Sequence, residues 1–175
     1  MCTHCQKAEA EPRRTTREAG VTLIELMVTL SIMAILLGIA MPSIDSAMVG
    51  SKVNSYANSL VASSNAARSE AIKRNTAVTM CVSADGASCS SGGWEQGWIV
   101  LAGTDVIVRQ EAASNGFRLT GTVSSISFQP TGVGATQTTI TVCRATPTAG
   151  AQERVVSISA TGRASTARTH TGVCS

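Results

Sequence analysis

The sequence predicts an α+β protein in which a long N-terminal helix packs on a small antiparallel β-sheet domain. An apolar run from Val21 to Met41 leads into a helical pattern that continues to Asn75. Short β-branched segments follow, separated by Gly, Asp, Asn and Pro. With 175 residues, the chain has room for one modest domain plus an anchor. We expect boundaries at residues 1–20, 21–42, 43–75 and 76–175.

The apolar run has the length of a membrane span. It holds 21 residues, and a helix that crosses a bilayer needs roughly 20. Its polar members are Thr22, Glu25, Thr29 and Ser31. Basic residues beside a span favour the cytoplasmic side, and the preceding segment contains Lys7, Arg13, Arg14 and Arg17. We therefore expect a single pass, with the N-terminus in the cytoplasm and residues 76–175 outside it.

Residues 43–75 predict an amphipathic half-helix. Pro42 should bend or loosen the helix before it, because proline lacks an N–H and clashes with the preceding turn. Apolar or small residues then recur on one helical face, at Val49, Val53, Tyr56, Leu60, Ala67 and Ala71. Glu70 and Arg74 have the spacing of an i,i+4 ion pair. This half-helix should pack one face against the domain.

The remainder reads as strands of an antiparallel sheet. We expect strands at Thr76–Val82, Gly97–Ala102, Val106–Gln110, Ser124–Gln129, Thr138–Arg144 and Arg154–Ala160. Trp94 and Trp98 are best explained as core or loop anchors, since large aromatic side chains bury much area without needing a ligand.

The sequence has six cysteines, of which Cys2 and Cys5 lie in residues 1–20. Four of them fall in residues 76–175, where an even number in an oxidising compartment indicates disulfides. Of the three pairings that four cysteines allow, we favour Cys81–Cys89, which closes a short loop, and Cys143–Cys174, which ties down a tail rich in Gly, Ser and Thr. The segment Cys2-Thr3-His4-Cys5 offers half of a zinc site, and no second pair lies nearby, so we expect no metal.

Gly20-Val21-Thr22-Leu23-Ile24-Glu25-Leu26 resembles the cleavage signature of type IV pilins and pseudopilins. The resemblance implies that a prepilin peptidase cuts after Gly20, removes residues 1–20 as a leader and methylates the new N-terminus at Val21. The family usually has phenylalanine where this chain has Val21. The implied location is the inner membrane, with the C-terminal domain in the periplasm and the subunit incorporated into a filament.

A second set of residues is similar to the GspH/FimT group of minor pilins and pseudopilins. It comprises Ala67–Asn75, Val78–Cys81, Cys89 and Trp94–Trp98, and more loosely Cys143, Val155, Val156, Gly162, Arg163 and Cys174 of the FimT/FimU branch. The resemblance implies a minor subunit that helps to initiate assembly and sits near the tip of a type IV pilus or a type II secretion pseudopilus. The implied partners are other minor subunits and the major pilin. The sequence does not separate pilus from pseudopilus.

Glu25 is the candidate assembly residue. In a filament, its carboxylate can pair with the N-terminal amine of a neighbour's Val21, which removes two costly charges from an apolar core and fixes the axial register. The alternative is a carboxylate that reaches the lipid headgroups. Pro42 is the second candidate, because the region before such a proline can unwind when pilin-like subunits pack; the alternative is a simple helix break.

Arg163 and Arg168 are candidate DNA contacts. In DNA-uptake subunits of the FimT type, a glycine-arginine-x-arginine element contacts the DNA backbone; here Gly162-Arg163 is present, the second arginine is missing, and Arg168 comes later. From residue 109 onward there are six arginines against two glutamates, a local charge of +4, and Arg144 and Arg154 could extend the patch. A DNA-binding minor pilin of a competence pilus is therefore the alternative function. Ordinary solubilising charge also accounts for these residues.

Nothing in the sequence indicates an enzyme. The expected mature chain has one histidine, His170, and the sequence has no Gly-x-Ser-x-Gly element, phosphate-binding glycine loop or carboxylate cluster. We expect no catalytic residue and no cofactor.

Overall fold

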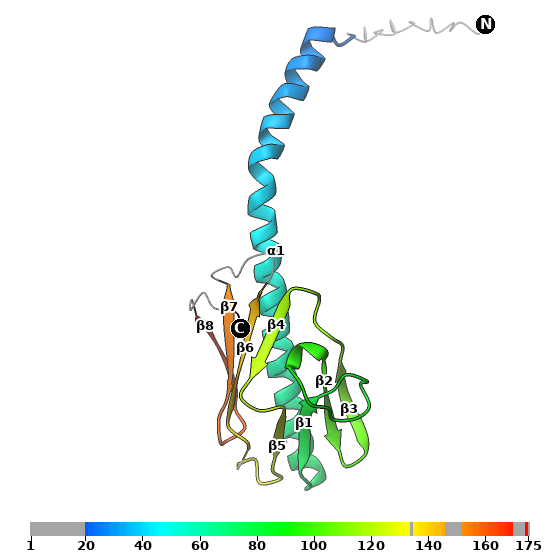
Figure 1. Ribbon diagram of the computed structural model, residues 1–175, viewed down its shortest axis with the longest axis vertical. Coiled ribbons are helices and arrows are strands. Elements are labelled where there is room, and N and C mark those ends of the chain that lie inside the picture. Colours follow the sequence, from blue (N-terminus) through cyan, green and yellow to red (C-terminus); the bar gives the residue numbers. More distant parts are fainter. Residues whose placement is uncertain (1–19, 134, 146–151, 170–173, 175) are drawn as a thin grey trace, which may run out of the picture. The chain divides into compact units, whose positions relative to one another are not determined.

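The computed structural model describes residues 20–133, 135–145, 152–169 and 174, and of residues 39–46 only the backbone (Figure 1). Helix α1 covers Leu23–Arg74 and a short 3₁₀ helix, η1, covers Trp94–Gln96. The strands are β1 (Val78–Val82), β2 (Trp98–Ala102), β3 (Asp105–Gln110), β4 (Phe117–Gly121), β5 (Ser125–Phe128), β6 (Thr138–Arg144), β7 (Glu153–Ile158) and β8 (Ala164–Thr169). The chain divides into two units, residues 1–41 and 42–175.

The strands of residues 42–175 form two antiparallel sheets, where the sequence predicted one. The first has the order β3-β2-β1-β5 and the second β4-β6-β7-β8. Both lie alongside the second half of α1 (Figure 1). The fold class is α+β, as predicted, with the β-structure divided between two four-stranded sheets.

The second half of α1 supplies one wall of the core. Its buried residues step by four, three, four, three and four positions, at Val53, Ala57, Leu60, Ser64, Ala67 and Ala71. They pack with side chains from both sheets, among them Met80, Ile126, Leu119, Ile140 and Val156. The predicted amphipathic face is confirmed at Val53, Leu60, Ala67 and Ala71, whereas Val49 and Tyr56 are only partly buried.

Trp98 ties this helix to the first sheet. Its side chain is 1% exposed, and its Nε1–H donates to Ser63 Oγ of α1 at 3.0 Å. Trp94 is equally buried, packs edge-to-face on Trp98 and donates from Nε1 to the Val123 carbonyl at 2.8 Å. Both tryptophans are core anchors whose polar atoms are satisfied, as buried indoles require.

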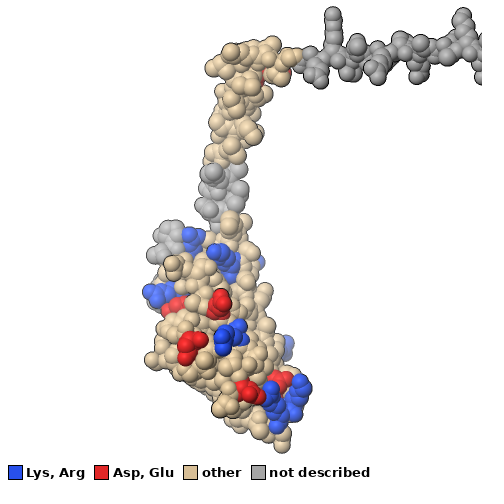
Figure 2. All heavy atoms as spheres, turned by 90° about the vertical axis from the view of Figure 1, so that its right-hand side faces the viewer, with Lys and Arg blue, Asp and Glu red and all other residues tan. Residues whose placement is uncertain are grey.

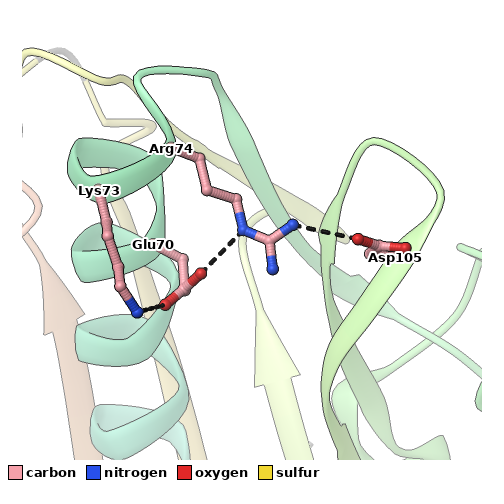
Figure 3. A network of polar contacts seen from close by, with 4 residues as sticks. All are labelled: Glu70, Lys73, Arg74 and Asp105. Carbon is pink, nitrogen blue, oxygen red and sulfur yellow. Dashed lines mark hydrogen bonds and ion pairs between the residues drawn. The ribbon is translucent and has the colours of Figure 1, made fainter.

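The C-terminal end of α1 is joined to the β2–β3 hairpin through ion pairs (Figure 3). Glu70 accepts hydrogen bonds from Lys73 at 3.0 Å and from Arg74 at 2.8 Å, which confirms the i,i+4 pair. Arg74 also reaches Asp105 at 3.1 Å. The hydrogen bonds from Arg74 and then Lys73 lower the pKa of Glu70. Asn75 ends the helix at a φ of +51°, a conformation that asparagine tolerates.

Two disulfides close the domain. Cys81, at the end of β1, bonds to Cys89, and Cys143 of β6 bonds to Cys174, with Cα–Cα distances of 5.5 and 5.7 Å. These are the two pairs that the sequence favours. The first closes a loop of 8 residues and the second a loop of 31, and the stabilisation from a cross-link grows with loop length.

The structure differs from the sequence-based expectation in its strands and in the buried face of its helix. Strands β4 and β8 were not predicted. Strand β4 has only five residues, of which two are buried, and β8 has no buried residue. Helix α1 continues through Pro42, because one proline removes only one backbone hydrogen bond, and the bend or loosening before Pro42 stays a prediction. Ser63 and Ser64 are also buried, at 4% and 0% exposure, although neither is among the residues from which the buried helical face was predicted.

Ser63→Ala should destabilise the domain. The change leaves Trp98 Nε1–H buried without an acceptor, at a cost of about 1–3 kcal/mol, which the better helix propensity of alanine offsets by roughly 0.5 kcal/mol. Urea denaturation followed by tryptophan fluorescence should show a net loss of about 1–2 kcal/mol. Ser69→Ala, at an exposed position of the same helix, is the control and should leave stability unchanged or slightly higher. Equal effects of the two changes would contradict the role of this hydrogen bond.

Candidate functional site

The N-terminal part of α1 begins with a capped turn. Thr22 precedes the helix, and its Oγ1 accepts a hydrogen bond from the Glu25 backbone N–H at 3.3 Å. Thr22 and Glu25 have the Thr-x-x-Glu spacing of a capping box, and the structure forms the half of it in which the threonine hydroxyl accepts. Gly20 and Val21 lie outside the helix and are exposed. The helix therefore starts two residues after the candidate cleavage site.

Apolar side chains cover this part of the helix on every side. Twelve large hydrophobic side chains are at least half exposed, at Val21, Leu23, Ile24, Leu26, Met27, Val28, Leu30, Ile32, Met33, Ile35, Leu36 and Leu37. A helix that is apolar all round is normally buried in protein or in lipid. This surface therefore requires a cover that residues 20–38 do not themselves supply.

The hydroxyl groups on this surface are internally satisfied. Thr29 Oγ1 donates to the Leu26 carbonyl at 2.9 Å, and Ser31 Oγ donates to the Met27 carbonyl at 2.8 Å. Such bonds to the preceding turn hide a hydroxyl from an apolar surrounding. Within the described part of the chain, the Glu25 carboxylate has no such partner. Glu25 is thus the unmatched polar group of an otherwise apolar helix surface.

Some of the sequence-based predictions fall outside what can be described. Residues 1–19, with Cys2 and Cys5, and the side chain of Pro42 are outside the described residues. In the part of the chain that the structure describes, no helix has the combined length and apolarity needed to cross a membrane.

Arg163 lies at the β7–β8 turn. Its backbone N–H donates to Ser159 Oγ at 3.2 Å and its carbonyl accepts from the Ser159 N–H at 3.1 Å. Gly162 makes the turn with a φ of +69°, a conformation that glycine adopts without strain. The exposed Arg163 side chain borders a hydroxyl-rich surface with Thr139, Ser157 and Ser165.

Arg168 is grouped with Arg154 and not with Arg163. It lies opposite Arg154 in the β7–β8 register, and both line a cleft with Ala47, Gly50, Ser51, Asn54 and Gln152. Arg168 comes five positions after Arg163, roughly 16 Å along an extended chain. The structure therefore does not bring the two candidate DNA contacts into one pocket.

Arg154 is held in place by hydrogen bonds. The residue is 7% exposed, its Nε–H donates to Asn54 Oδ1 of α1 at 2.8 Å, and its guanidinium also donates to the Glu153 carbonyl at 2.9 Å. Burial, and then the charge of Arg168, lower the pKa of Arg154. Like charges facing each other across a strand pair are unfavourable, so this arrangement favours an anion nearby.

A second pair of cations flanks the other side of the same stretch of α1. Lys52 and Arg144 line a smaller cleft with Met48, Val49, Asn115 and Phe117. Lys52 Nζ lies 5.7 Å from the centroid of the Phe117 ring, in range of a cation–π contact. Reading the sequence missed Lys52, because only the folded register places it beside Arg144.

The loop closed by Cys81–Cys89 is organised around Asp85. Its Oδ1 accepts from the Ala87 N–H at 2.8 Å and the Ser88 N–H at 2.9 Å, and the hydroxyls of Ser88 and Ser83 donate to the same carboxylate at 2.7 and 3.0 Å. These hydrogen bonds, those from Ser88 and Ala87 first, lower the pKa of Asp85 well below its usual range.

Stability should therefore depend on pH through Asp85. Because the folded-state pKa is depressed, the contribution is complete above the unfolded pKa of about 3.9 and is lost as pH falls toward the folded value. Asp85→Asn should lower stability at pH 7 and flatten its dependence between roughly pH 2 and 5, measured by urea denaturation across that range. Glu111→Gln, at an exposed carboxylate, is the control. Parallel pH profiles for the wild type and Asp85→Asn would contradict this account.

Two family models match the chain. One, described as type II transport protein GspH, matches residues 56–162, and the other, the prokaryotic N-terminal methylation motif, matches residues 15–41. No curated protein sequence matches significantly.

Two crystal structures of the type IV minor pilin FimU of Pseudomonas aeruginosa PAO1 resemble the chain. The P2₁ form is 23% identical, with a TM-score of 0.53, over 66% of this chain and 87% of that chain. The P6₅ form is 24% identical, with a TM-score of 0.49, over 65% and 91%. The first likeness shows a shared fold. Because the GspH match spans more than half of the sequence, the chain belongs to the GspH family of type IV pilin-like minor pilins and pseudopilins.

Proposed function

We propose that this protein is a membrane-anchored minor subunit that helps to initiate assembly of a type IV pilus or a type II secretion pseudopilus and sits near its tip. The observation that carries the proposal is Glu25, a carboxylate without a partner in the described residues, on a helix whose large apolar side chains are exposed on all sides. Before assembly the inner membrane covers this surface, with the C-terminal domain in the periplasm. In the filament, the same surface packs against other minor subunits and the major pilin.

Processing prepares the partner for Glu25. A prepilin peptidase cuts after Gly20, which is exposed; apart from its chain neighbours, no described residue has an atom within 4 Å of the position that a Cβ would take there. The cut creates an amine on Val21, which the same enzyme methylates. In the filament the amine of one subunit pairs with the Glu25 carboxylate of its neighbour, and both charges are neutralised away from water. Only one axial offset brings the two together, which sets the register.

Pro42 has a separate part in this proposal. Packing of subunits favours local unwinding of the helix around position 42, because proline already removes one backbone hydrogen bond there. The unwound segment lets the 43–175 region adjust to its neighbours while the apolar half stays in the filament core.

Glu25→Gln should insert into the membrane normally but assemble poorly. Removing one member of a buried charge pair leaves the other unpaired, at a cost of about 3–5 kcal/mol, so incorporation should fall by at least tenfold. The measurement is the amount of the subunit in sheared filaments relative to the membrane fraction, by immunoblot. Glu111→Gln, an exposed carboxylate of the domain, is the matched control and should assemble normally. Normal incorporation of Glu25→Gln would rule out the pairing.

DNA binding on a competence pilus is the second candidate function. It is supported by two exposed arginines, Arg163 and Arg168, near the two ends of β8. Roughly 16 Å separates them along the strand, so they would contact different phosphates of one backbone. Arg144 and Arg154 would add to the electrostatic attraction of the DNA without contacting further phosphates.

The full mature chain in detergent micelles tests this candidate by retardation of duplex DNA at several salt concentrations. Each phosphate contact contributes close to one unit to the slope of log K against log salt. Arg163→Ala and Arg168→Ala should each lower the affinity and reduce the slope by about one, whereas Arg109→Ala on β3 should change neither. Unaltered binding in both variants would remove these arginines as contacts.

A further inference from the structure

We propose that the cleft of Arg154 and Arg168 binds the phosphate of an anionic phospholipid headgroup while the subunit waits in the membrane. The inference rests on the membrane anchoring in the proposed function and adds a second, electrostatic contact to it. The cleft lies between α1 and the β7–β8 pair and has a volume of about 630 Å³, within the usual range of small-ligand sites.

The residues around the cleft match an anion. Two guanidinium groups face it from neighbouring strands, and the remaining lining consists of two amides, one hydroxyl and two small residues of α1, with no carboxylate among its described residues. Arginine presents donors in a planar fork that fits phosphate oxygens. The hydrogen bonds from Arg154 to Asn54 Oδ1 and to the Glu153 carbonyl fix that side chain before any ligand arrives.

The neighbouring carboxylate, Glu153, does not line the cleft. Glu153 precedes Arg154 on β7, is fully buried, and its Oε2 accepts from Thr169 Oγ1 at 3.3 Å. Successive strand residues point to opposite faces, and Arg154 faces the helix through Asn54. Glu153 therefore belongs to the opposite face of the sheet.

Lys52 and Arg144 extend the positive charge around the helix. Together with Arg154 and Arg168 they form what we call the basic collar, which lies against residues 47–54 of α1 on two sides. On the face of the domain drawn in Figure 2, basic side chains lie at the upper end, and basic and acidic side chains are interspersed below it. On this face, positive charge is therefore more concentrated at one end of the domain.

The position of the collar along the chain selects a headgroup as the occupant. The apolar run ends at Met41, and the first residue that lines the cleft is Ala47. Only five residues separate the two along the chain, so the cleft follows directly after the apolar run. Clusters of basic residues next to a span are attracted to anionic lipids.

The test uses the full mature chain in nanodiscs of phosphatidylcholine and in nanodiscs of phosphatidylglycerol. Thermal unfolding is followed by the fluorescence of Trp94 and Trp98, the two tryptophans of the chain, both buried in the core. The unfolding midpoint should be higher in phosphatidylglycerol by about 3–5 °C, and 0.5 M salt should abolish the difference. No difference between the two lipids would overturn the proposal.

Variants at the two ends of one strand separate this site from general charge. Arg168→Gln should lose most of the lipid-dependent shift, and Arg154→Lys, which keeps the charge but not the planar fork, should lose part of it. Arg163→Gln, which removes the same charge at the other end of β8, should keep the full shift. Equal losses in Arg168→Gln and Arg163→Gln would overturn a specific cleft.

Additional arms identify the occupant. Inorganic phosphate added to phosphatidylcholine discs should give less than half of the shift; a full shift would make a free anion the ligand and overturn the headgroup assignment. A duplex oligonucleotide that raises the midpoint in phosphatidylcholine discs through Arg168, with no effect of phosphatidylglycerol, would assign the cleft to nucleic acid instead.

Retention of the protein in the nanodiscs at 1 M salt tests the membrane anchor separately from the headgroup contact. Retention without a lipid-dependent shift leaves the anchor intact and overturns the headgroup contact. Release at 1 M salt, with association at low salt in phosphatidylglycerol discs alone, overturns the anchor and supports the headgroup contact. No association in either lipid overturns both.

Discussion

An apolar helix surface that carries a single carboxylate must be covered, and the carboxylate must find a counter-charge where it is covered. The first half of α1 imposes both requirements: its large apolar side chains are exposed on every side, and Thr29 and Ser31 turn their hydroxyls onto the helix backbone while Glu25 does not. Lipid alone meets the first requirement. In the proposed filament, a neighbouring subunit with a free amine at Val21 would meet both requirements.

The second half of the same helix meets a different requirement. It supplies one wall of a core shared by two sheets, and it is connected to them by polar contacts at several levels: Asn54 with Arg154, Tyr56 with the Ser114 N–H, and Ser63 with Trp98. Near its C-terminal end, Arg74 reaches Asp105 of β3. Force applied to the helix would therefore be shared by both sheets. The disulfides add restraints at Cys81 and Cys143, one in each sheet.

Patterns of neighbouring residues in the sequence predicted the buried helix face and most of the strands, because these features depend on short-range interactions. The helical spacing identified the buried face at Val53, Leu60 and Ala67, and β-branched segments located six of the eight strands in the described residues. The division into two sheets could not be read, because it depends on pairing between distant segments such as β1 with β5 and β4 with β6. Strand β8 was not predicted, because its sequence has no alternation of large apolar and polar residues. The burial of Ser63 required knowledge of where Trp98 would lie.

The candidate sites divide in the same way. The Gly20–Glu25 signature is a linear motif, so sequence could locate it. The grouping of the arginines is not: Arg163 and Arg168 looked like one patch, but the strand register sets Arg168 beside Arg154 and sends Arg163 to the far turn. Mutation can therefore distinguish DNA binding through Arg163 and Arg168 from headgroup binding through Arg154 and Arg168, because Arg168 is the one direct contact that the two proposals share.

In the proposed filament, cleavage after Gly20 creates the amine that Glu25 needs. Mass spectrometry of the subunit in filaments sheared from native cells tests this pairing. We expect a chain that begins at Val21, carries one methyl group on its amine and is present at low copy number relative to the major subunit. A processed chain found in the inner membrane but absent from the sheared filaments would assign it to a secretion pseudopilus. A filament-bound chain that retains residues 1–20 would contradict the pairing, because the amine would then lie far from Glu25.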